Sequence, residues 1–113
     1  MAREIIRQSA KFSKKDTINS RNGYALKDVE NGEVLTVTAC AQMTNTDEET
    51  GELKYVTVLV TPEKEYYTAI SAMIYDAAPD LIDMLDDVDS AVEIKVGKRN
   101  SKAGREFLTM TIL

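Results

Sequence analysis

Two neighbouring runs of alternating apolar and polar residues constrain the fold more than any other feature of the sequence. Residues 33–44 and 53–61 both carry an apolar side chain at every second position along most of their length. An alternation with a period of two predicts a strand that buries one face. The acidic segment of residues 45–52, which also contains Gly51, separates the two runs by the length of a turn. We therefore expect these two strands to form a long hairpin.

Shorter strands are expected on either side of this hairpin. Residues 24–29 have the composition of a strand, and the Asn31-Gly32 pair that follows is a strong signal for a tight hairpin turn. Residues 65–70 contain two tyrosines, a threonine and an isoleucine, which favour a sheet. The alternative for this segment is a helix that begins around Pro62, and we favour the strand.

The second half of the chain predicts one helical segment and two further strands. Residues 71–87 place apolar side chains at helical spacing, and Pro79 within them predicts a kink or two short helices. Alternation returns in residues 92–96 and 106–113. Residues 97–105 between these two strands are expected to form a flexible loop.

The order of these elements predicts the fold class. It is mainly β with one helical segment: five principal strands, with the helix between the third and the fourth. This is the order of the oligonucleotide/oligosaccharide-binding (OB) fold, a five-stranded β-barrel. A chain of 113 residues has the usual size of one domain. We expect residues 1–22 to form a basic N-terminal arm or a short first element, and residues 23–113 to form a single OB-like β-barrel domain.

Two absences narrow the chemistry that this chain can perform. It has no histidine, and Cys40 is its one cysteine. Zinc fingers, cysteine–histidine nucleophile pairs, serine–histidine–aspartate triads and histidine proton shuttles are therefore excluded. The sequence also has no glycine-rich phosphate-binding motif. We expect a protein that is not an enzyme, with no catalytic residues, no cofactor and no bound metal.

The distribution of apolar residues indicates in which compartment of the cell the protein is expected. No apolar run approaches the roughly 20 residues that a membrane-spanning helix needs. The first residues also lack the apolar stretch of a secretory signal. We expect a cytoplasmic protein without a membrane partner.

Charge is unevenly distributed along the chain, whose net charge is −5. Residues 1–21 carry a net charge of +4 and residues 95–105 a net charge of +5, whereas residues 22–94 carry −13. Salt screens charges beyond about 8 Å at physiological ionic strength, so the local potential decides what a surface attracts. Two basic segments on an acidic body are compatible with a phosphate-binding face, although such segments are also common as solvated loops.

Residues 95–105 give the strongest candidate site. In OB barrels the loop between the fourth and fifth strands is one of two that bind oligonucleotides. Proteins that bind single strands combine a cationic track for phosphates with aromatic rings on which bases stack. The candidate cations are Lys95, Lys98, Arg99, Lys102 and Arg105, the candidate rings are Phe107 and Tyr55, and Lys14, Lys15 and Arg21 would extend the track.

Two segments of this sequence resemble small phage-type single-stranded DNA-binding proteins. One is the T-x-T-D-x-x-T-G-E hairpin of residues 44–52, and the other is the basic K-R-x-S-K-x-G-R-E-F ending of residues 98–107. The resemblance spans residues 23–113 and implies an OB-fold-like protein that coats single strands in phage or mobile-element replication or recombination, without sequence preference or cofactor. The chain departs from better-known bacterial members because it lacks tryptophan and an acidic C-terminal tail, so recruitment of replication enzymes through such a tail is in doubt.

These observations leave two functions open. The first is sequence-independent binding of single-stranded DNA, with RNA as a further partner that the sequence does not exclude and a homo-oligomer as an open assembly state. The alternative is a non-enzymatic protein-interaction or structural module of a phage or mobile element. That module would use the acidic body, or would pair its C-terminal strand edge to edge with another chain.

Overall fold

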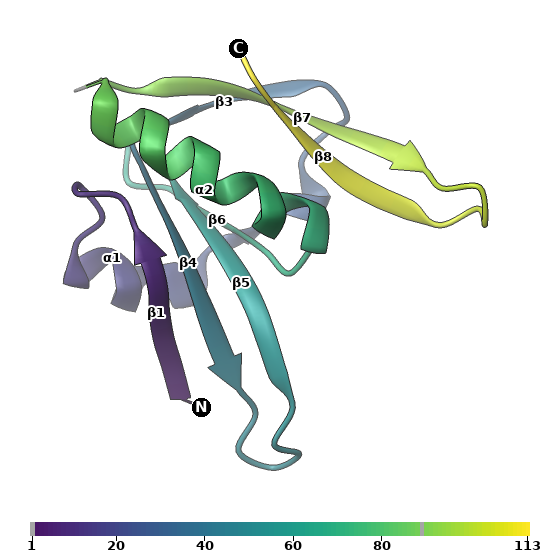
Figure 1. Ribbon diagram of the computed structural model, residues 1–113, viewed down its shortest axis with the longest axis horizontal. Helices are drawn as coiled ribbons and strands as arrows, with labels where there is room; N and C mark the ends of the chain where they lie inside the picture. Colours follow the sequence, from purple (N-terminus) through teal and green to yellow (C-terminus); the bar gives the residue numbers. More distant parts are fainter. Residues whose placement is uncertain (1, 89) are drawn as a thin grey trace.

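The computed structural model describes residues 2–88 and 90–113, which form eight β-strands and two α-helices (Figure 1). No helix in these ranges is long and apolar enough to cross a membrane. Two short 3₁₀-helices, Ser20–Asn22 and Leu26–Asp28, flank the second strand. In chain order the main elements are β1 (Ala2–Gln8), α1 (Lys14–Asn19), β2 (Tyr24–Ala25), β3 (Glu33–Val37), β4 (Ala39–Thr46), β5 (Leu53–Val60), β6 (Tyr66–Ala69), α2 (Ala72–Asp87), β7 (Val92–Asn100) and β8 (Glu106–Ile112).

The strands form two open sheets. The larger sheet has the strand order β1-β4-β5-β6-β2, and the smaller has the order β3-β7-β8. Neighbouring strands are antiparallel except for β2 and β6, which are parallel. The mainly β class is therefore confirmed. The expected five-stranded OB-like barrel is not, because the described strands do not close on themselves and a second helix is present.

The central hairpin is confirmed as β4 and β5. Their register runs from Thr46 opposite Leu53 to Ala39 opposite Val60. In the turn between them, the Gly51 N–H donates to the Asp47 carbonyl at 2.7 Å, and Gly51 has a φ of 71°, which glycine adopts at little cost. The acidic turn thus closes the hairpin that the alternating pattern predicts.

The prediction of one continuous strand over residues 33–44 is wrong, because the chain changes sheets at Thr38. β3 before this residue pairs with β7, and β4 after it pairs with β5. The Thr38 N–H and hydroxyl both donate to the Val60 carbonyl, at 2.8 and 3.2 Å, and hold the bend in place. Strands often pass from one packed sheet to another at such bends. An apolar residue at every second position fits both strands, so the pattern does not reveal the break.

The predicted strand over residues 24–29 is also largely wrong. Within these residues the strand is limited to Tyr24–Ala25, and the chain then enters the 3₁₀-helix Leu26–Asp28. The expected hairpin at Asn31-Gly32 does not form. A type I′ turn needs positive φ at both residues, and of the two only Gly32 has it, at 87°. The Gly32 turn instead leads into β3, which pairs with β7, whereas β2 pairs with β6.

The N-terminal segment folds against the sheet. β1 pairs with β4. Residues 9–20, expected as a loop or arm, contain α1, whose start is a capping box: the Asp16 N–H donates to the Ser13 hydroxyl, and the Ser13 N–H donates to the Asp16 carboxylate. Phe12 is buried in the core. The proposed domain boundary after residue 22 stays a prediction.

The predicted strand at residues 65–70 and the predicted helix are confirmed as β6 and α2, but Pro79 does not divide the helix. Proline lacks the N–H that would donate to the carbonyl four residues earlier, which belongs to Tyr75. The Gln42 side-chain amide from β4 donates to this carbonyl at 2.6 Å. The helix therefore continues through Pro79 because a side chain on the sheet replaces the missing backbone donor.

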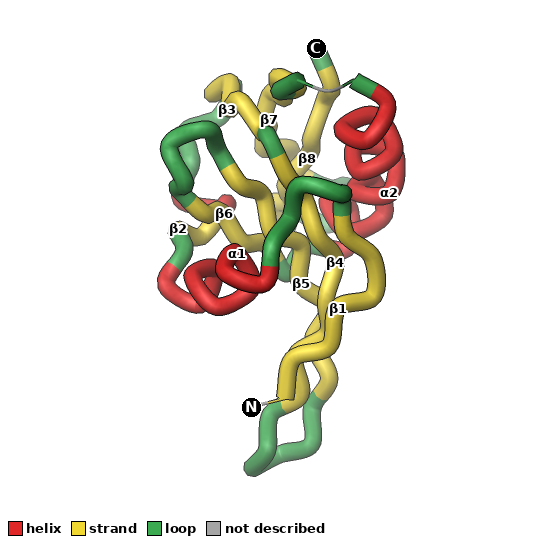
Figure 2. Tube along the Cα trace, turned by 90° about the vertical axis from the view of Figure 1, so that its left-hand side faces the viewer, coloured by secondary structure: helices red, strands yellow, loops and turns green. Residues whose placement is uncertain are grey.

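The core lies on both faces of the larger sheet. On one face, Phe12 packs with Ala41, Met43, Val58 and Tyr66, the last from β6. On the other face, α2 contacts β4, β5 and β8, and its buried side chains join those of both sheets. Figure 2 shows α1 and α2 on opposite sides of the larger sheet. Residues 39–44 of β4, between these two layers, are all buried.

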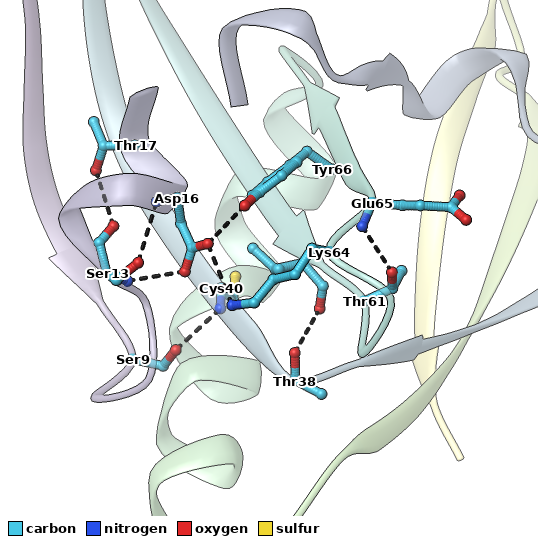
Figure 3. A network of polar contacts seen from close by, with 11 residues as sticks. Ser9, Ser13, Asp16, Thr17, Thr38, Cys40, Thr61, Lys64, Glu65 and Tyr66 are labelled. Carbon is cyan, nitrogen blue, oxygen red and sulfur yellow. Dashed lines mark hydrogen bonds and ion pairs between the residues drawn. The ribbon is translucent and has the colours of Figure 1, made fainter. Parts of the chain in front are cut away.

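A buried carboxylate holds α1 to the sheet. Asp16 is 1% exposed and accepts hydrogen bonds from the Tyr66 hydroxyl at 2.7 Å and the Ser13 N–H at 2.9 Å (Figure 3). Lys64 Nζ lies 3.4 Å from the same carboxylate. Burial raises the pKa of Asp16, but the hydrogen bonds and the Lys64 charge together outweigh burial, and its pKa lies below the usual value. Asp16 is therefore ionised in the folded protein.

We expect Asp16→Asn to lower the free energy of unfolding by about 2 kcal/mol at neutral pH, the range for hydrogen bonds to a charged group. Since the pKa of Asp16 is lower in the folded than in the unfolded chain, ionised Asp16 stabilises the fold above its unfolded pKa. This stabilisation is lost as the pH falls through the folded pKa. The difference between the variant and the wild type should therefore shrink below about pH 4. Urea denaturation at a series of pH values measures it.

The matched control is Asp80→Asn, an exposed carboxylate on α2. A surface change of this kind should alter the free energy of unfolding by less than about 0.5 kcal/mol. Two results would contradict the stabilising role of ionised Asp16. One is an equal loss of free energy of unfolding in both variants, and the other is a loss in Asp16→Asn that does not change with pH.

A double-mutant cycle tests the bond between Gln42 and the Tyr75 carbonyl. Gln42→Leu should lower the free energy of unfolding by about 1–3 kcal/mol, because the carbonyl loses its donor. In a Pro79→Ala background the same change should cost less, since the backbone then has an N–H at position 79 that can donate to the Tyr75 carbonyl. Equal costs in the two backgrounds, measured by urea denaturation, would show that the amide does not replace the proline donor.

Candidate nucleic-acid interface

The basic segment near the C-terminus lies on a projecting hairpin. β3 pairs with β7 only over Val92 to Val96, so residues 97–109 extend beyond it as a two-stranded ribbon, which we call the arm (Figure 1). Residues 97–105 are therefore not one flexible loop, because β7 continues to Asn100. The tip is a turn in which the Ser101 N–H donates to the Arg105 carbonyl at 2.8 Å, and Gly104 has a φ of 81°.

The arm and the strand leading into it carry the five predicted cations. Lys95, Arg99, Lys102 and Arg105 are exposed, and Lys98 is half-buried. Within residues 2–88 and 90–113, none of the five forms an ion pair with a carboxylate. Their charges are thus available to an anionic ligand.

Phe107 lies where the arm meets the body of the protein. It is half-buried and lines a hollow of about 510 Å³ together with Lys27, Ile70 and Leu108. Ile70 follows β6 directly and is 69% exposed. The predicted ring is therefore neither sealed in the core nor fully exposed, and its hollow has an apolar wall.

Tyr55 lines a second hollow of about 500 Å³, with Leu53, Ile70 and Tyr75 among its walls. Its ring is 51% exposed and contacts the ring of Tyr75 edge to face, with centroids 5.3 Å apart. Ile70 belongs to both hollows. We call the two hollows together the groove; Ser71, Ala72 and Tyr75, at the N-terminal end of α2, are among its lining residues.

Charged side chains of both signs line the groove. Lys27 and Lys54 contribute positive charge, whereas Glu52, Asp76 and Glu106 contribute negative charge. The concentration of unpaired positive charge lies beside the groove, on the arm. An elongated polyanion with flat apolar groups matches this arrangement, with its rings in the groove and its charges along the arm.

The three predicted N-terminal cations are not brought to the groove. Lys14 and Lys15 lie on α1, and Arg21 lies in the 3₁₀-helix that follows it. Phe12 and Asp16 fix this segment to the face of the larger sheet opposite α2 (Figure 2). The groove lies on the α2 side, so the arm and α1 present their charges on different sides of the molecule.

Sequence reasoning missed Tyr75 and Ile70 as parts of this surface. Tyr75 lies one turn into α2, at a position that the periodicity alone does not place over β5. Ile70 reads as the last residue of a predicted strand, but β6 ends at Ala69 and leaves Ile70 exposed. Only the packing of α2 against β5 brings these residues to Tyr55, and no local pattern indicates that contact.

The described residues offer little for catalysis. Cys40 is fully buried, and burial raises the pKa of its thiol to about 12, so it is not a thiolate at neutral pH. Within residues 2–88 and 90–113, no group of three acidic or cysteine side chains is placed to hold a metal ion.

Comparisons with known proteins identify the family of the chain. The model of a Phi29-type family, described as phage single-stranded DNA-binding protein, matches residues 13–113. The single-stranded DNA-binding protein of Bacillus phage B103 is 27% identical over 101 residues, which cover 85% of this chain and 83% of that protein. No solved structure matches the chain. The resemblance read from the two short motifs is thereby confirmed, and the chain belongs to the Phi29-type family of phage single-stranded DNA-binding proteins.

Proposed function

We propose that this protein binds single-stranded DNA in the groove, with bases stacked on Phe107, Tyr55 and Tyr75 and phosphates held by the cations of the arm. One observation carries this assignment: rings from β8, β5 and α2 line two hollows that share Ile70, beside a ribbon whose cations form no ion pair within residues 2–88 and 90–113. Membership of the family supports the ligand, and the geometry supports the place where it binds.

This mode of binding is independent of sequence. Every base has a flat face that can stack on a ring, and every nucleotide carries the same phosphate. In a duplex, the paired bases expose only their edges, in the major and minor grooves of the DNA. Bases that stack on the aromatic rings of the protein must therefore be unpaired. During replication of a phage or mobile-element genome, single strands of any sequence are exposed. A protein that coats them must select single strands without selecting a sequence.

The family also bears on the alternative function. A family of single-stranded DNA-binding proteins is one of binding proteins, which supports the expectation of a chain that is not an enzyme. β8 is an edge strand, as the interaction-module hypothesis requires. A titration of labelled oligo-dT at low salt separates the two functions: saturable binding supports the groove, and no binding at roughly 50 μM protein, a concentration well above the Kd range of specific complexes, supports the interaction module.

The rings can be tested by substitution. Tyr55→Ala and Phe107→Ala should each weaken binding of oligo-dT by about 1–3 kcal/mol, roughly 5- to 150-fold in Kd, because each removes a stacking surface. The protein has five tyrosines and no tryptophan. Its ultraviolet fluorescence therefore reports tyrosines, and stacking on Tyr55 and Tyr75 should quench part of it.

The matched control is Tyr24→Ala. Tyr24 is 61% exposed and contacts Tyr67 with ring centroids 5.6 Å apart, at a site that shares no ring with the groove. We expect oligo-dT affinity and quenching to be unchanged in this variant. If Tyr24→Ala weakens binding as much as Tyr55→Ala does, the bases lie elsewhere.

The cations of the arm tip can be tested through salt dependence. Neutralisation of three to five phosphates on a single strand gives a slope of log K against log salt of about −2 to −3.5. Reversal of charge in Lys102→Glu with Arg105→Glu should weaken binding and flatten this slope by about 1.4. The matched pair Lys14→Glu with Lys15→Glu, on α1, should change the slope far less. Equal effects of the two pairs would extend the DNA track to α1.

A further inference from the structure

The arm borders a third hollow that is separate from the groove. It has a volume of about 240 Å³ and shares no lining residue with either part of the groove. We call it the outer hollow. Its walls come from the start of β3, from β7 and from β8, and include Asn31, Lys95, Gly97, Arg99, Thr109 and Thr111.

Backbone contacts build this hollow. The Gly32 N–H donates to the Val96 carbonyl at 2.7 Å, and the Lys98 N–H donates to the Asn31 side-chain oxygen at 2.9 Å. These two bonds hold the Asn31-Gly32 turn against β7. The strongest turn signal of the sequence thus forms a wall of the outer hollow instead of closing a hairpin.

Glycine at position 97 leaves room for the Thr109 hydroxyl beside the outer hollow. A Cβ atom at this position would lie 2.5 Å from the hydroxyl oxygen of Thr109, which faces it across the β7–β8 pair. Real Cβ atoms do not approach so closely, so any side chain here would displace its neighbour. The Thr109 hydroxyl occupies the space that a side chain would fill.

The groups around the outer hollow are donors and positive charges. Lys95, Lys98 and Arg99 line it, and none of the carboxylates within residues 2–88 and 90–113 does. Thr109 and Thr111 add hydroxyl groups, which can donate hydrogen bonds. A ligand with several acceptor oxygens and negative charge matches this set, and a phosphate group is the common biological ligand of that kind.

The position of the outer hollow connects it to the groove. Arg99, which lines the outer hollow, is the direct cross-strand partner of Phe107, which lines the groove. Such partners have Cα atoms about 4.5–5.5 Å apart. A strand whose base stacks on Phe107 therefore has its adjoining backbone within reach of the outer hollow, which favours a phosphodiester of the same strand over a free anion.

We propose that the outer hollow is a phosphodiester subsite, so that bound DNA does not end in the groove but continues across the arm. This proposal rests on the proposed function, because the strand must first occupy the groove. Arg99 and Phe107 are directly opposite each other, so their side chains lie on the same face of the arm. A base on Phe107 is then followed along this face by a phosphate held by Lys95, Arg99 and the threonine hydroxyls. The stretch of strand covered by each protein is correspondingly longer than the groove alone would cover.

The test uses the full chain and the double variant Lys95→Gln with Arg99→Gln, both exposed positions where glutamine keeps a long polar side chain without the charge. The variant should flatten the salt slope for oligo-dT binding by about 1.4, the loss of two contacts on a single strand. It should also occlude fewer nucleotides in a stoichiometric titration of poly-dT. Tyrosine quenching at saturation should be unchanged, because the rings of the groove are intact.

The matched control is Lys14→Gln with Lys15→Gln, which removes two cations on the opposite side and should leave the slope and the occluded length near those of the wild type. A second variant, Gly97→Ala, should reduce the occluded length, because the added Cβ displaces the Thr109 hydroxyl. Since this displacement also disturbs the β7–β8 pair, the glutamine pair remains the decisive measurement.

Three outcomes would overturn the proposal. An unchanged slope and occluded length in Lys95→Gln with Arg99→Gln, with quenching intact, removes the outer hollow and leaves the groove. In the second outcome, inorganic phosphate changes the NMR chemical shifts of the Gly97 and Thr109 amides while the salt slope of oligo-dT binding is the same in the glutamine variant as in the wild type. That result would assign the outer hollow to a free anion. If oligo-dT does not quench the tyrosine fluorescence of the wild type, the groove itself is rejected. This result distinguishes failure of the proposed function from failure of the outer hollow alone.

Discussion

Burial of β4 on both faces is the constraint on which the rest of the structure depends. Residues 39–44 contact the layer of Phe12 and α1 on one side and α2 on the other. Polar side chains in this stretch must then find partners inside the core, as Gln42 does at the Tyr75 carbonyl. Because a two-sided strand fills the centre, the N-terminal segment and α2 take opposite sides of the molecule (Figure 2).

This layering decides which charges can act together. The acidic body and the basic segments give a net charge of −5, which alone would argue against a polyanionic ligand. The fold instead projects one basic segment as the arm and attaches the other to the far face of the sheet. The bond from Gln42 also fixes the turn of α2 that carries Tyr75, so a core contact positions one ring of the groove. Local geometry, and not net charge, therefore makes DNA binding feasible.

Much of this could be predicted from the sequence, and the failures have identifiable causes. The β4–β5 hairpin, α2 and the two last strands follow from local periodicity, and β6 follows from its residue types. The basic segment beside Phe107 was expected as a flexible loop, whereas β7 continues to Asn100. The break at Thr38 is not visible, since residues on both sides of it continue one alternation. The helix α1 was missed because Ser13 and Asp16 form a capping box within a polar segment that has no apolar stripe. The groove was only half predicted, because the contact between Tyr55 and Tyr75 depends on how α2 packs against β5.

The most direct test of the account is to find which side chains touch the bases. An oligo-dT in which single thymines are replaced by 5-iododeoxyuridine can be photo-crosslinked to the protein and the attachment sites read by peptide mass spectrometry. The account predicts crosslinks at Phe107, Tyr55 and Tyr75. Crosslinks confined to Tyr24, Tyr67 or the α1 segment would contradict it, because they would place the bases outside the groove.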